Sequence, residues 1–319
     1  GFYSAVESDH LEPKTFRQAW DHEDPDIRLK WRTAIKKEIS DMIRRGVWRH
    51  RPKSELPSDR RLIGAKWVFK VKNSGTYRAR CVALGYSQIP GVDFTENFSP
   101  VVNDVTLRAC LIISIQKGWS RRTLDVETAF LEGDLEEEIF MKTPPGYEEV
   151  LKDLGAGFEE ILGEINDDTI CELLKTIYGL VQAALMWYKK IAGILVDKLN
   201  FKKNRKDPCL FYKKDDHGEI VICLYVDDSA MMGDDVALKK AESDLKEHFT
   251  VTCEELKNYV GCDYLITEKG INLHQPKLIK RIKEKFADEL KDLPTKNTPA
   301  TSGYTVGEMK EGDQAISKG

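Results

Sequence analysis

The sequence predicts an α+β fold whose antiparallel sheet carries acidic side chains at one end. Residues 222–233 form two apolar runs separated by Asp227 and Asp228, the pattern of a buried β-hairpin with two carboxylates at its tip. Within residues 123–130, which follow Gly118-Trp119, a second apolar strand has Asp125 at its end. Between these strands lie segments whose apolar residues recur at helical spacing. Antiparallel hairpins together with separate helices indicate the mixed α+β class.

The three acids predict a metal site. Carboxylates beside core-type residues repel one another and resist burial, and a divalent cation held by oxygen ligands removes both costs. Two-metal nucleotidyl transfer needs acids from separate strands to converge, because the ions lie roughly 3.5–4 Å apart and both touch the transferred phosphate. Asp125 with Asp227 and Asp228 meets this need, and Val126 would add its backbone carbonyl. The competing interpretation of Asp227-Asp228 is an ordinary solvated turn.

The order of importance among the acids follows from strand geometry. Neighbouring side chains of an extended strand point to opposite faces. Asp227 and Asp228 therefore cannot both face one ion unless the turn reorients them. We rank Asp125 and Asp227 above Asp228 as metal ligands.

A second hairpin is predicted where residues 67–72 meet an Asn-Ser-Gly turn and residues 77–84 return. Strand alternation places basic side chains on one face of this hairpin, which suits the binding of a triphosphate. The alternative is a solvated strand face without a ligand. The basic residues are Lys66, Lys70, Lys72, Arg78 and Arg80.

Six sequence blocks occur in a fixed order along the chain: Lys-Trp-Val-Phe-Lys at 66–70, Tyr-Arg-Ala-Arg at 77–80, Phe-Ser-Pro at 98–100, Leu-Asp-Val-Glu-Thr-Ala-Phe at 124–130, Tyr-Gly-Leu-Val-Gln at 178–182 and Tyr-Val-Asp-Asp at 225–228. With these blocks the chain resembles the reverse transcriptase region of copia-type long-terminal-repeat retrotransposons, from about residue 20 to 299. The likeness implies a right-hand polymerase fold with fingers, palm and thumb, in which the antiparallel palm sheet carries the catalytic acids. It implies RNA-directed and DNA-directed DNA synthesis on a primer with two Mg²⁺ ions, for which Mn²⁺ can substitute.

The resemblance also implies residue roles. Lys70 with Arg78 or Arg80 would contact the triphosphate, and the alignment leaves the choice of arginine open. Phe130 would lie under the incoming sugar and reject a 2′-hydroxyl, although core packing is its rival role. Gln182 would contact the nucleotide through its amide. Tyr225 and Val226 complete the box around the paired acids.

Departures from the family pattern keep two further hypotheses open. Val181 stands where a lysine is usual, Ala184 and Leu185 replace a Pro-Arg pair, and Leu84 occupies a position that is commonly basic. The chain could therefore be a degenerate or domesticated nucleic-acid-binding remnant without activity. A third hypothesis is a metal-dependent enzyme that shares the palm but acts on mononucleotides or cleaves strands, against which the finger and glutamine blocks argue.

Composition restricts partners and location. The 319 residues are 41% hydrophobic and 32% charged with a net charge of −4, so any surface for template and primer must be local. No apolar run approaches the roughly 20 residues of a membrane span, and seven scattered cysteines suggest neither zinc nor disulfides.

We expect a polyprotein fragment that lacks ribonuclease H and integrase segments and uses deoxynucleoside triphosphates. We expect it in the cytoplasm, within virus-like particles if the parent element is active.

The expected organisation has five parts and several helices. The helix from Asp24-Pro25 to Arg45-Gly46 is a packing helix, Asp104 caps the next helix, and residues 187–195 form another. Asp234-Asp235 begins the helix Val236 to Phe249, and residues 276–290 form a basic amphipathic one. The parts are an N-terminal extension (1–19), fingers (20–117), palm (118–255, with a loop or insertion at 148–168 and a return to the fingers at 171–186), primer side and thumb (256–293) and a linker (294–319).

Overall fold

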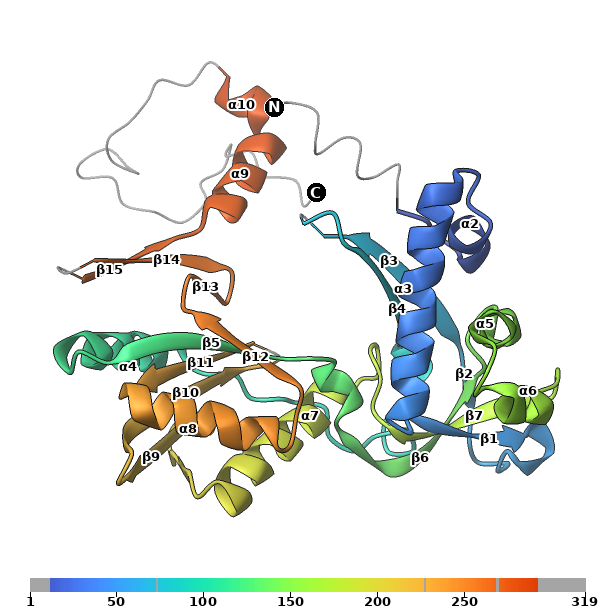
Figure 1. Cartoon of the computed structure of the whole chain (residues 1–319), viewed down its shortest axis with the longest axis horizontal. Helices are drawn as coiled ribbons and strands as arrows, with labels where there is room; N and C mark the ends of the chain where they lie inside the picture. Colours follow the sequence, from blue (N-terminus) through green and yellow to red (C-terminus); the bar gives the residue numbers. More distant parts are fainter. Residues whose placement is uncertain (1–11, 73, 227, 268–269, 292–319) are drawn as a thin grey trace, which may run out of the picture. The chain divides into compact units, whose positions relative to one another are not determined.

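The computed structural model describes residues 12–72, 74–226, 228–267 and 270–291. Asp227 and the predicted linker at 294–319 lie outside the described residues. The chain divides into two compact units, residues 1–273 and 274–319. The first unit contains the hydrophobic cores and the candidate site (Figure 1).

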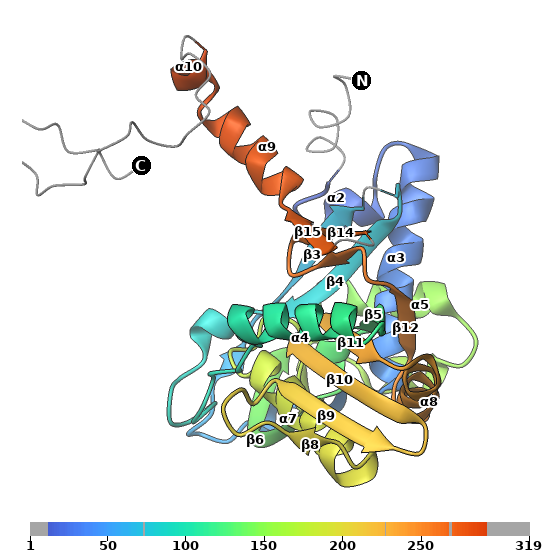
Figure 2. The same cartoon turned by 90° about the vertical axis from the view of Figure 1, so that its left-hand side faces the viewer.

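The acidic strands belong to an antiparallel sheet of six strands within the described part of the chain, in the order β12-β5-β11-β10-β9-β8 (Figure 2). Its hairpin of β10 and β11 is the one that the apolar runs predict, and β5 pairs with β11 on the other side. The strands are β5 (Ser120–Val126), β8 (Lys202–Lys203), β9 (Leu210–Asp215), β10 (Gly218–Tyr225), β11 (Asp228–Gly233) and β12 (Val251–Glu255).

Three helices supply the apolar residues that bury this sheet: α4 (Asp104–Gln116), α7 (Ala183–Gly193) and α8 (Asp235–Lys246). The helix predicted at 187–195 is α7, which continues into the single π turn η4 (Ile194–Lys198). Asp234 is the N-cap of α8, as the sequence indicates. The predicted cap of α4 is wrong by one residue. Asn103 caps this helix by accepting from the Val105 N–H, and Asp104 instead pairs with Arg108.

A second core lies among α2 (Phe16–Trp20), α3, the β3–β4 hairpin and another sheet in the order β1-β7-β6-β2. Gly179, in the loop after β7, has a φ of +91°, and a Cβ there would lie 2.2 Å from the Ala83 carbonyl oxygen. This close approach joins the loop to the end of β4. The elements are β1 (Trp48–Pro52), η1 (Lys53–Glu55), β2 (Leu62–Ile63), β3 (Ala65–Val71), β4 (Tyr77–Ala83), η2 (Gly85–Ser87), η3 (Ala129–Leu131), β6 (Asp134–Lys142) and β7 (Thr169–Lys175).

Helix α3 (Pro25–Arg44) is the predicted packing helix. Asp24 caps it by accepting from the N–H groups of Asp26 and Ile27, and Pro25 occupies its first turn. Trp31 is fully buried, and its ring meets Phe69 of β3 and Tyr77 of β4 edge-on. The helix is thereby fixed against the basic hairpin.

Two predicted segments differ from the structure. Residues 148–168 are not a simple loop, because α5 (Tyr147–Leu154) and α6 (Glu159–Glu164) form there. Tyr147, Val150 and Leu151 are buried at helical spacing, but the many acids and glycines of the segment hide that pattern. The predicted helix at 276–290 is divided into α9 (Pro276–Lys285) and α10 (Ala287–Leu290).

The remaining described elements form a small sheet, β13 (Asn258–Tyr259), β14 (Cys262–Thr267) and β15 (Gly270–His274). Tyr259 is buried and donates its hydroxyl to the Cys223 carbonyl of β10, which ties β13 to the six-stranded sheet. None of the helices in the described ranges is both long and apolar enough to cross a membrane.

Candidate active site

Asp125 of β5 and Asp228 of β11 lie directly opposite each other in the antiparallel register. Directly opposed residues point to the same face of a sheet, with Cβ atoms about 4.5–5.5 Å apart. Both aspartates are exposed, whereas their neighbours Leu124 and Ser229 are buried. Strands separated by about a hundred residues of chain therefore present two carboxylates to one point at the edge of the core.

The turn that precedes Asp228 is held in an unusual conformation. Tyr225 pairs with Asp228, so Val226 lies in the turn that joins the two strands of the hairpin. Val226 has a φ of +53°, a left-handed value that strains a β-branched residue by about 1–3 kcal/mol. The buried Trp187 ring donates from Nε1 to the Val226 carbonyl oxygen at 2.8 Å. We infer that Trp187 stabilises this strained turn.

Replacing Trp187 with phenylalanine is expected to slow catalysis about tenfold and to lower the free energy of unfolding by about 1–2 kcal/mol, since one buried hydrogen bond is lost. Single-turnover kinetics and denaturant unfolding would measure the two effects. Trp187→Phe keeps an aromatic ring beside Phe249, whose centroid lies 5.3 Å away. Unchanged kinetics would show that the turn does not need this bond.

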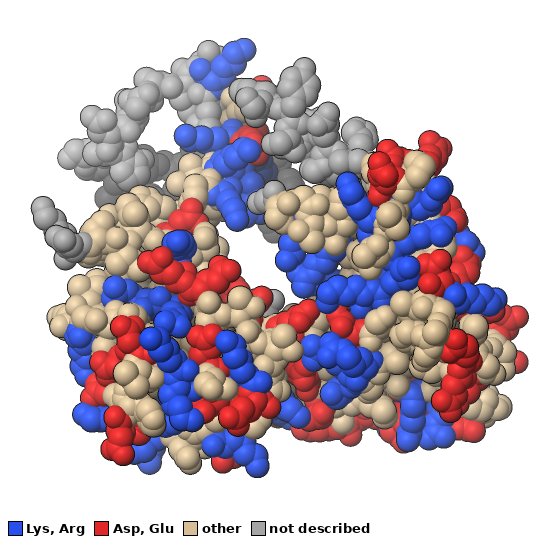
Figure 3. All heavy atoms as spheres, viewed as in Figure 1, with Lys and Arg blue, Asp and Glu red and all other residues tan. Residues whose placement is uncertain are grey.

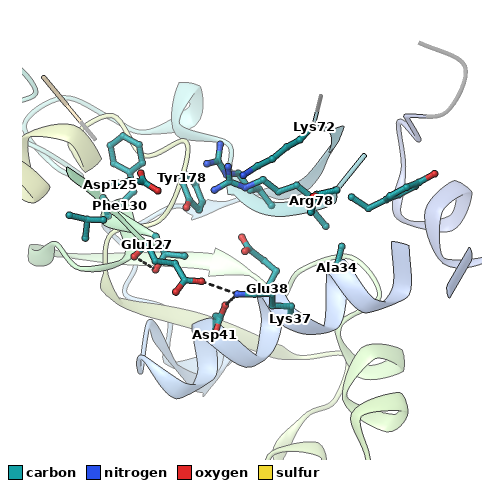
Figure 4. Close-up of a pocket in the computed structure, with 17 residues that line it drawn as sticks. Ala34, Lys37, Glu38, Asp41, Lys72, Arg78, Asp125, Glu127, Phe130 and Tyr178 are labelled. Carbon is teal, nitrogen blue, oxygen red and sulfur yellow. Dashed lines mark hydrogen bonds and ion pairs between the residues drawn. The ribbon is translucent and has the colours of Figure 1, made fainter. Parts of the chain in front are cut away.

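A cavity of about 300 Å³ opens beside Asp125, between α3, β4 and the β5–η3 turn (Figure 4). Helix α3 forms one wall, β4 with the end of β3 forms another, and the turn after Asp125 forms the third. Charged and aromatic side chains line it: Lys37, Glu38, Asp41, Lys72, Tyr77, Arg78, Arg80, Asp125, Glu127, Phe130 and Tyr178.

The cavity has a cationic wall. Arg78, Arg80 and Lys72 line it from the β3–β4 hairpin, and Figure 3 shows Lys and Arg side chains gathered over this hairpin and α3. The guanidinium of Arg80 lies 4.4 Å from the centroid of the Tyr178 ring. Its Nε is buried and has no hydrogen-bond partner within the described residues. An unpaired guanidinium donor beside a cavity suits an anionic ligand.

Lys70, for which the sequence predicts a triphosphate contact, belongs to β3 of the basic hairpin. It lies directly opposite Arg78 in the hairpin, but it does not line the cavity. Its side chain is 67% exposed, and its ammonium group pairs with Glu12 at 3.1 Å. Lys72, two residues further along the same face, reaches the cavity instead. The triphosphate contact of Lys70 stays a prediction, and the geometry favours Lys72.

Phe130 lies in the cavity wall close to Asp125 in the chain. Its ring meets Tyr178 edge-on at a centroid distance of 5.6 Å. Thr128, with a φ of +56°, reverses the chain before η3, and the Thr176 hydroxyl donates to the Phe130 carbonyl at 2.5 Å. These contacts hold Phe130 in the wall of the cavity that Asp125 also lines.

Gln182 lies outside the cavity wall. Its side chain is fully buried: Oε1 accepts from Gln88 Nε2 at 3.0 Å, and Nε2 donates to the Asp93 carbonyl at 2.9 Å. Gln88 Oε1 in turn accepts from the Val181 N–H. Both groups of the amide are therefore used inside the protein, and the predicted nucleotide contact of Gln182 stays a prediction.

Sequence reasoning overlooked the acidic and lysine residues that α3 contributes to the cavity. Lys37 bridges Asp41 at 2.6 Å and Glu127 at 3.0 Å, which links α3 to the turn after Asp125. Burial raises the pKa of Glu38 to about 7, against the opposing effect of the Cys81 N–H, Arg80 and Arg78. A signal for Glu38 was present, because a charged residue on the apolar stripe of Ile35 and Ile39 is unusual.

The oxygen donors suit a hard divalent cation. The described residues contain no group of three His, Cys, Asp or Glu side chains close enough to hold a metal ion. Asp125 and Asp228 form a facing pair, and the third predicted acid, Asp227, lies outside the described residues. Two carboxylates on neighbouring strands with the Val126 carbonyl nearby are ligands that Mg²⁺ accepts. The donor set therefore fits the predicted site as far as it is described.

Comparisons with known proteins agree with the sequence pattern. A family model described as reverse transcriptase (RNA-dependent DNA polymerase) matches residues 51–302. The chain is similar to the retrovirus-related Pol polyprotein from transposon TNT 1-94 of Nicotiana tabacum, at 32% identity over 92% of this chain and 21% of the relative. It is also similar to that from transposon RE2 of Arabidopsis thaliana, at 33% identity over 86% of this chain and 18% of the relative.

The chain spans about a fifth of the length of these curated relatives. Among solved structures, a foamy viral protease-reverse transcriptase in complex with ds DNA has 12% sequence identity and a TM-score of 0.38. That match covers 83% of this chain and 37% of the viral one.

Proposed function

Because the chain belongs to the reverse transcriptase (RNA-dependent DNA polymerase) family, we propose that it extends a primer 3′-hydroxyl with deoxynucleotides while copying an RNA or DNA template. The observation that carries this proposal is the facing pair of Asp125 and Asp228 at the edge of a cavity with a cationic wall. Acids at one end and guanidinium groups at the other match the two ends of a metal-bound triphosphate. The six-stranded sheet would be the palm, and the β3–β4 hairpin with α3 would belong to the fingers.

Reverse transcriptases use divalent metal ions, and we propose two Mg²⁺ ions here, with Mn²⁺ as a substitute. Asp125, Asp228 and the Val126 carbonyl would hold them together with Asp227. When bound, such ions lower the pKa of the attacking hydroxyl and neutralise the charge on the phosphates. The contribution of the chain is to fix the ligands: the β5–β11 register sets Asp125 against Asp228, and the Trp187 bond holds the turn between the paired strands.

The rest of the cavity would bind the nucleotide. Arg78, Arg80 and Lys72 face the space in which the triphosphate would lie, and guanidinium groups bind phosphate oxygens through paired hydrogen bonds. Phe130 would pack against the sugar at the position of the 2′-carbon. Because Arg80 and Phe130 both contact the ring of Tyr178, the phosphate and sugar ends of the pocket would share one aromatic wall.

Replacing Lys72 with alanine is expected to raise the KM for deoxynucleotides about tenfold, while Lys70→Ala changes it less than about twofold. The loss of one charge-assisted contact costs about 1.5–3 kcal/mol, but an exposed ion pair such as Lys70–Glu12 contributes little. Steady-state primer extension at varied nucleotide concentration would measure both. A larger increase in KM for Lys70→Ala than for Lys72→Ala would instead support the triphosphate contact predicted for Lys70.

The function is tested by RNA-templated primer extension with the purified chain, Mg²⁺ and four deoxynucleoside triphosphates. We expect full-length products that require both primer and metal ion. Salt-sensitive binding of primer-template without any incorporation would instead support the degenerate remnant. Hydrolysis or cyclisation of nucleoside triphosphates without primer would support an enzyme acting on mononucleotides.

The proposal extends to partners and location. The relatives are Pol polyproteins, so we propose that ribonuclease H and integrase segments of a parent polyprotein act together with this domain. The basic helix α9 would contact the primer-template as part of the thumb. We propose that synthesis takes place in the cytoplasm, within virus-like particles of an active parent element.

A further inference from the structure

Glu38 places a buried carboxylate among the cations of the nucleotide cavity. It projects from α3, and its side chain is directed from the helix into the cavity (Figure 4). The residue is only 8% exposed. Its Oε1 accepts a hydrogen bond from the Cys81 N–H at 3.1 Å, so it is anchored to the strand that carries Arg78 and Arg80. Both arginines stabilise its ionised form.

We propose that Glu38 is a positioning residue for nucleotide binding, which serves as the internal counter-ion of Arg78 and Arg80 and takes up a proton when a deoxynucleoside triphosphate enters the cavity. This inference rests on the function proposed above. Before the nucleotide binds, the carboxylate balances part of the charge of the two arginines, whose field favours its ionised form. When the phosphates engage the arginines, Glu38 loses its compensating charges and faces new negative charge.

The direction of proton movement follows from the groups around Glu38. A carboxylate that loses cationic partners and gains an anionic neighbour has its pKa raised. The groups that face it or line the same cavity include acids as well as cations, so the field of the cations is already partly balanced. They are Lys37 and Asp41 on α3, Lys72 at the end of β3, Arg78, Arg80 and Cys81 on β4, Asp125 and Glu127 on the β5–η3 turn, and Tyr178 after β7.

In the protein without nucleotide, Glu38 can gain or lose its proton near neutral pH. Burial raises the pKa of Glu38 to about 7 from its usual 4.5, so a further increase would protonate it under ordinary assay conditions.

The raised pKa of Glu38 also predicts how its contribution to the stability of the fold changes with pH. Because the folded-state pKa is raised, the contribution of Glu38 to stability is fully present below pH 4.5 and is lost as the pH rises to about 7. Glu38→Gln avoids this loss and keeps an acceptor for the Cys81 N–H, so the variant is expected to fold.

The test compares the KM for a deoxynucleotide in the full chain and in Glu38→Gln from pH 6 to pH 8.5. At pH 6 the wild-type carboxyl is neutral, and the two KM values should be similar. Above pH 7 the KM of the wild-type protein should rise relative to the KM of Glu38→Gln. The ratio of the two KM values should increase by about tenfold for each unit by which the bound nucleotide raises the pKa of Glu38. The ratio of kcat values should stay constant. A KM ratio that does not change with pH would overturn the proposal.

A second measurement does not depend on the variant. Calorimetric titration of a deoxynucleoside triphosphate into the wild-type primer-template complex with Ca²⁺ at pH 7.5, in two buffers of different ionisation enthalpy, should reveal net proton uptake. Proton uptake of zero, or equal uptake by Glu38→Gln, would contradict the inference. If neither protein binds or incorporates nucleotide at any pH, the proposed function fails instead. The two failures are therefore distinct.

Discussion

Asparagine in place of Asp125 is expected to reduce primer extension at least about 10³-fold while the fold remains intact. The substitution keeps the size of the side chain but removes the charge that would hold the metal ion. Metal-assisted stabilisation of the transferred phosphate is worth several kcal/mol, and each 1.36 kcal/mol corresponds to a factor of ten in rate. Asp125 is exposed at the end of β5, so the core does not depend on it.

Asp216→Asn is the matched control for this experiment. Asp216 is also an exposed aspartate, but it lies in the turn between β9 and β10, at the opposite end of β10 from the catalytic hairpin turn. Extension on an RNA template, with the circular dichroism spectrum and unfolding midpoint of each variant, separates catalysis from folding. Asp125→Asn protein with more than a tenth of wild-type activity would remove Asp125 from the reaction.

Alanine in place of Phe130 is expected to relax sugar selectivity by about 10- to 100-fold. The ring borders the cavity beside Asp125 and is fixed by Tyr178. It would exclude a 2′-hydroxyl by its bulk, and apolar pockets discriminate by about 1–3 kcal/mol. The measured quantity is the ratio of kcat/KM for a deoxynucleotide to that for the ribonucleotide with the same base, on one template.

Phe130→Tyr keeps the ring and should keep most of the selectivity, so it is the control for Phe130→Ala. The rival role of Phe130 is core packing, because it also contacts the edge of both hydrophobic clusters. In that case Phe130→Ala would lower the free energy of unfolding and reduce kcat/KM for both sugars by the same factor. The selectivity ratio thus distinguishes the two roles even if stability changes.

Local sequence signals predicted the elements around the site well, because each rests on short-range physics. The β10–β11 hairpin follows from two apolar runs, and the cap of α3 follows from Asp24-Pro25. The α+β class and the copia-type family likeness are confirmed. The pairing of β5 with β11 depends on contacts between residues about a hundred positions apart, so no local pattern gives its register.

The wrong cap of α4 and the unrecognised helices at 148–168 have equally physical causes, as do the contacts of Lys70 and Gln182, whose predicted roles stay predictions. Both Asn103 and Asp104 are good capping residues, and only the backbone conformation at Asn103 decides between them. Acidic residues and glycines at 148–168 hide two short helices that tertiary packing stabilises. Lys70 and Lys72 share a strand face, and their reach toward the cavity depends on neighbours such as Glu12. Gln182 has the right chemistry for a nucleotide, but its amide is used by Gln88 and Asp93.

The central claim is that acids from β5 and the β10–β11 hairpin hold divalent cations at the end of a growing strand. Anomalous diffraction from crystals of the chain with primer-template and Mn²⁺ tests it most directly. We predict a manganese peak bound to carboxylate oxygens of both Asp125 and Asp228, at about the 2.1 Å typical of small hard cations. Well-ordered crystals in which manganese binds elsewhere, with these two carboxylates turned apart, would contradict the account.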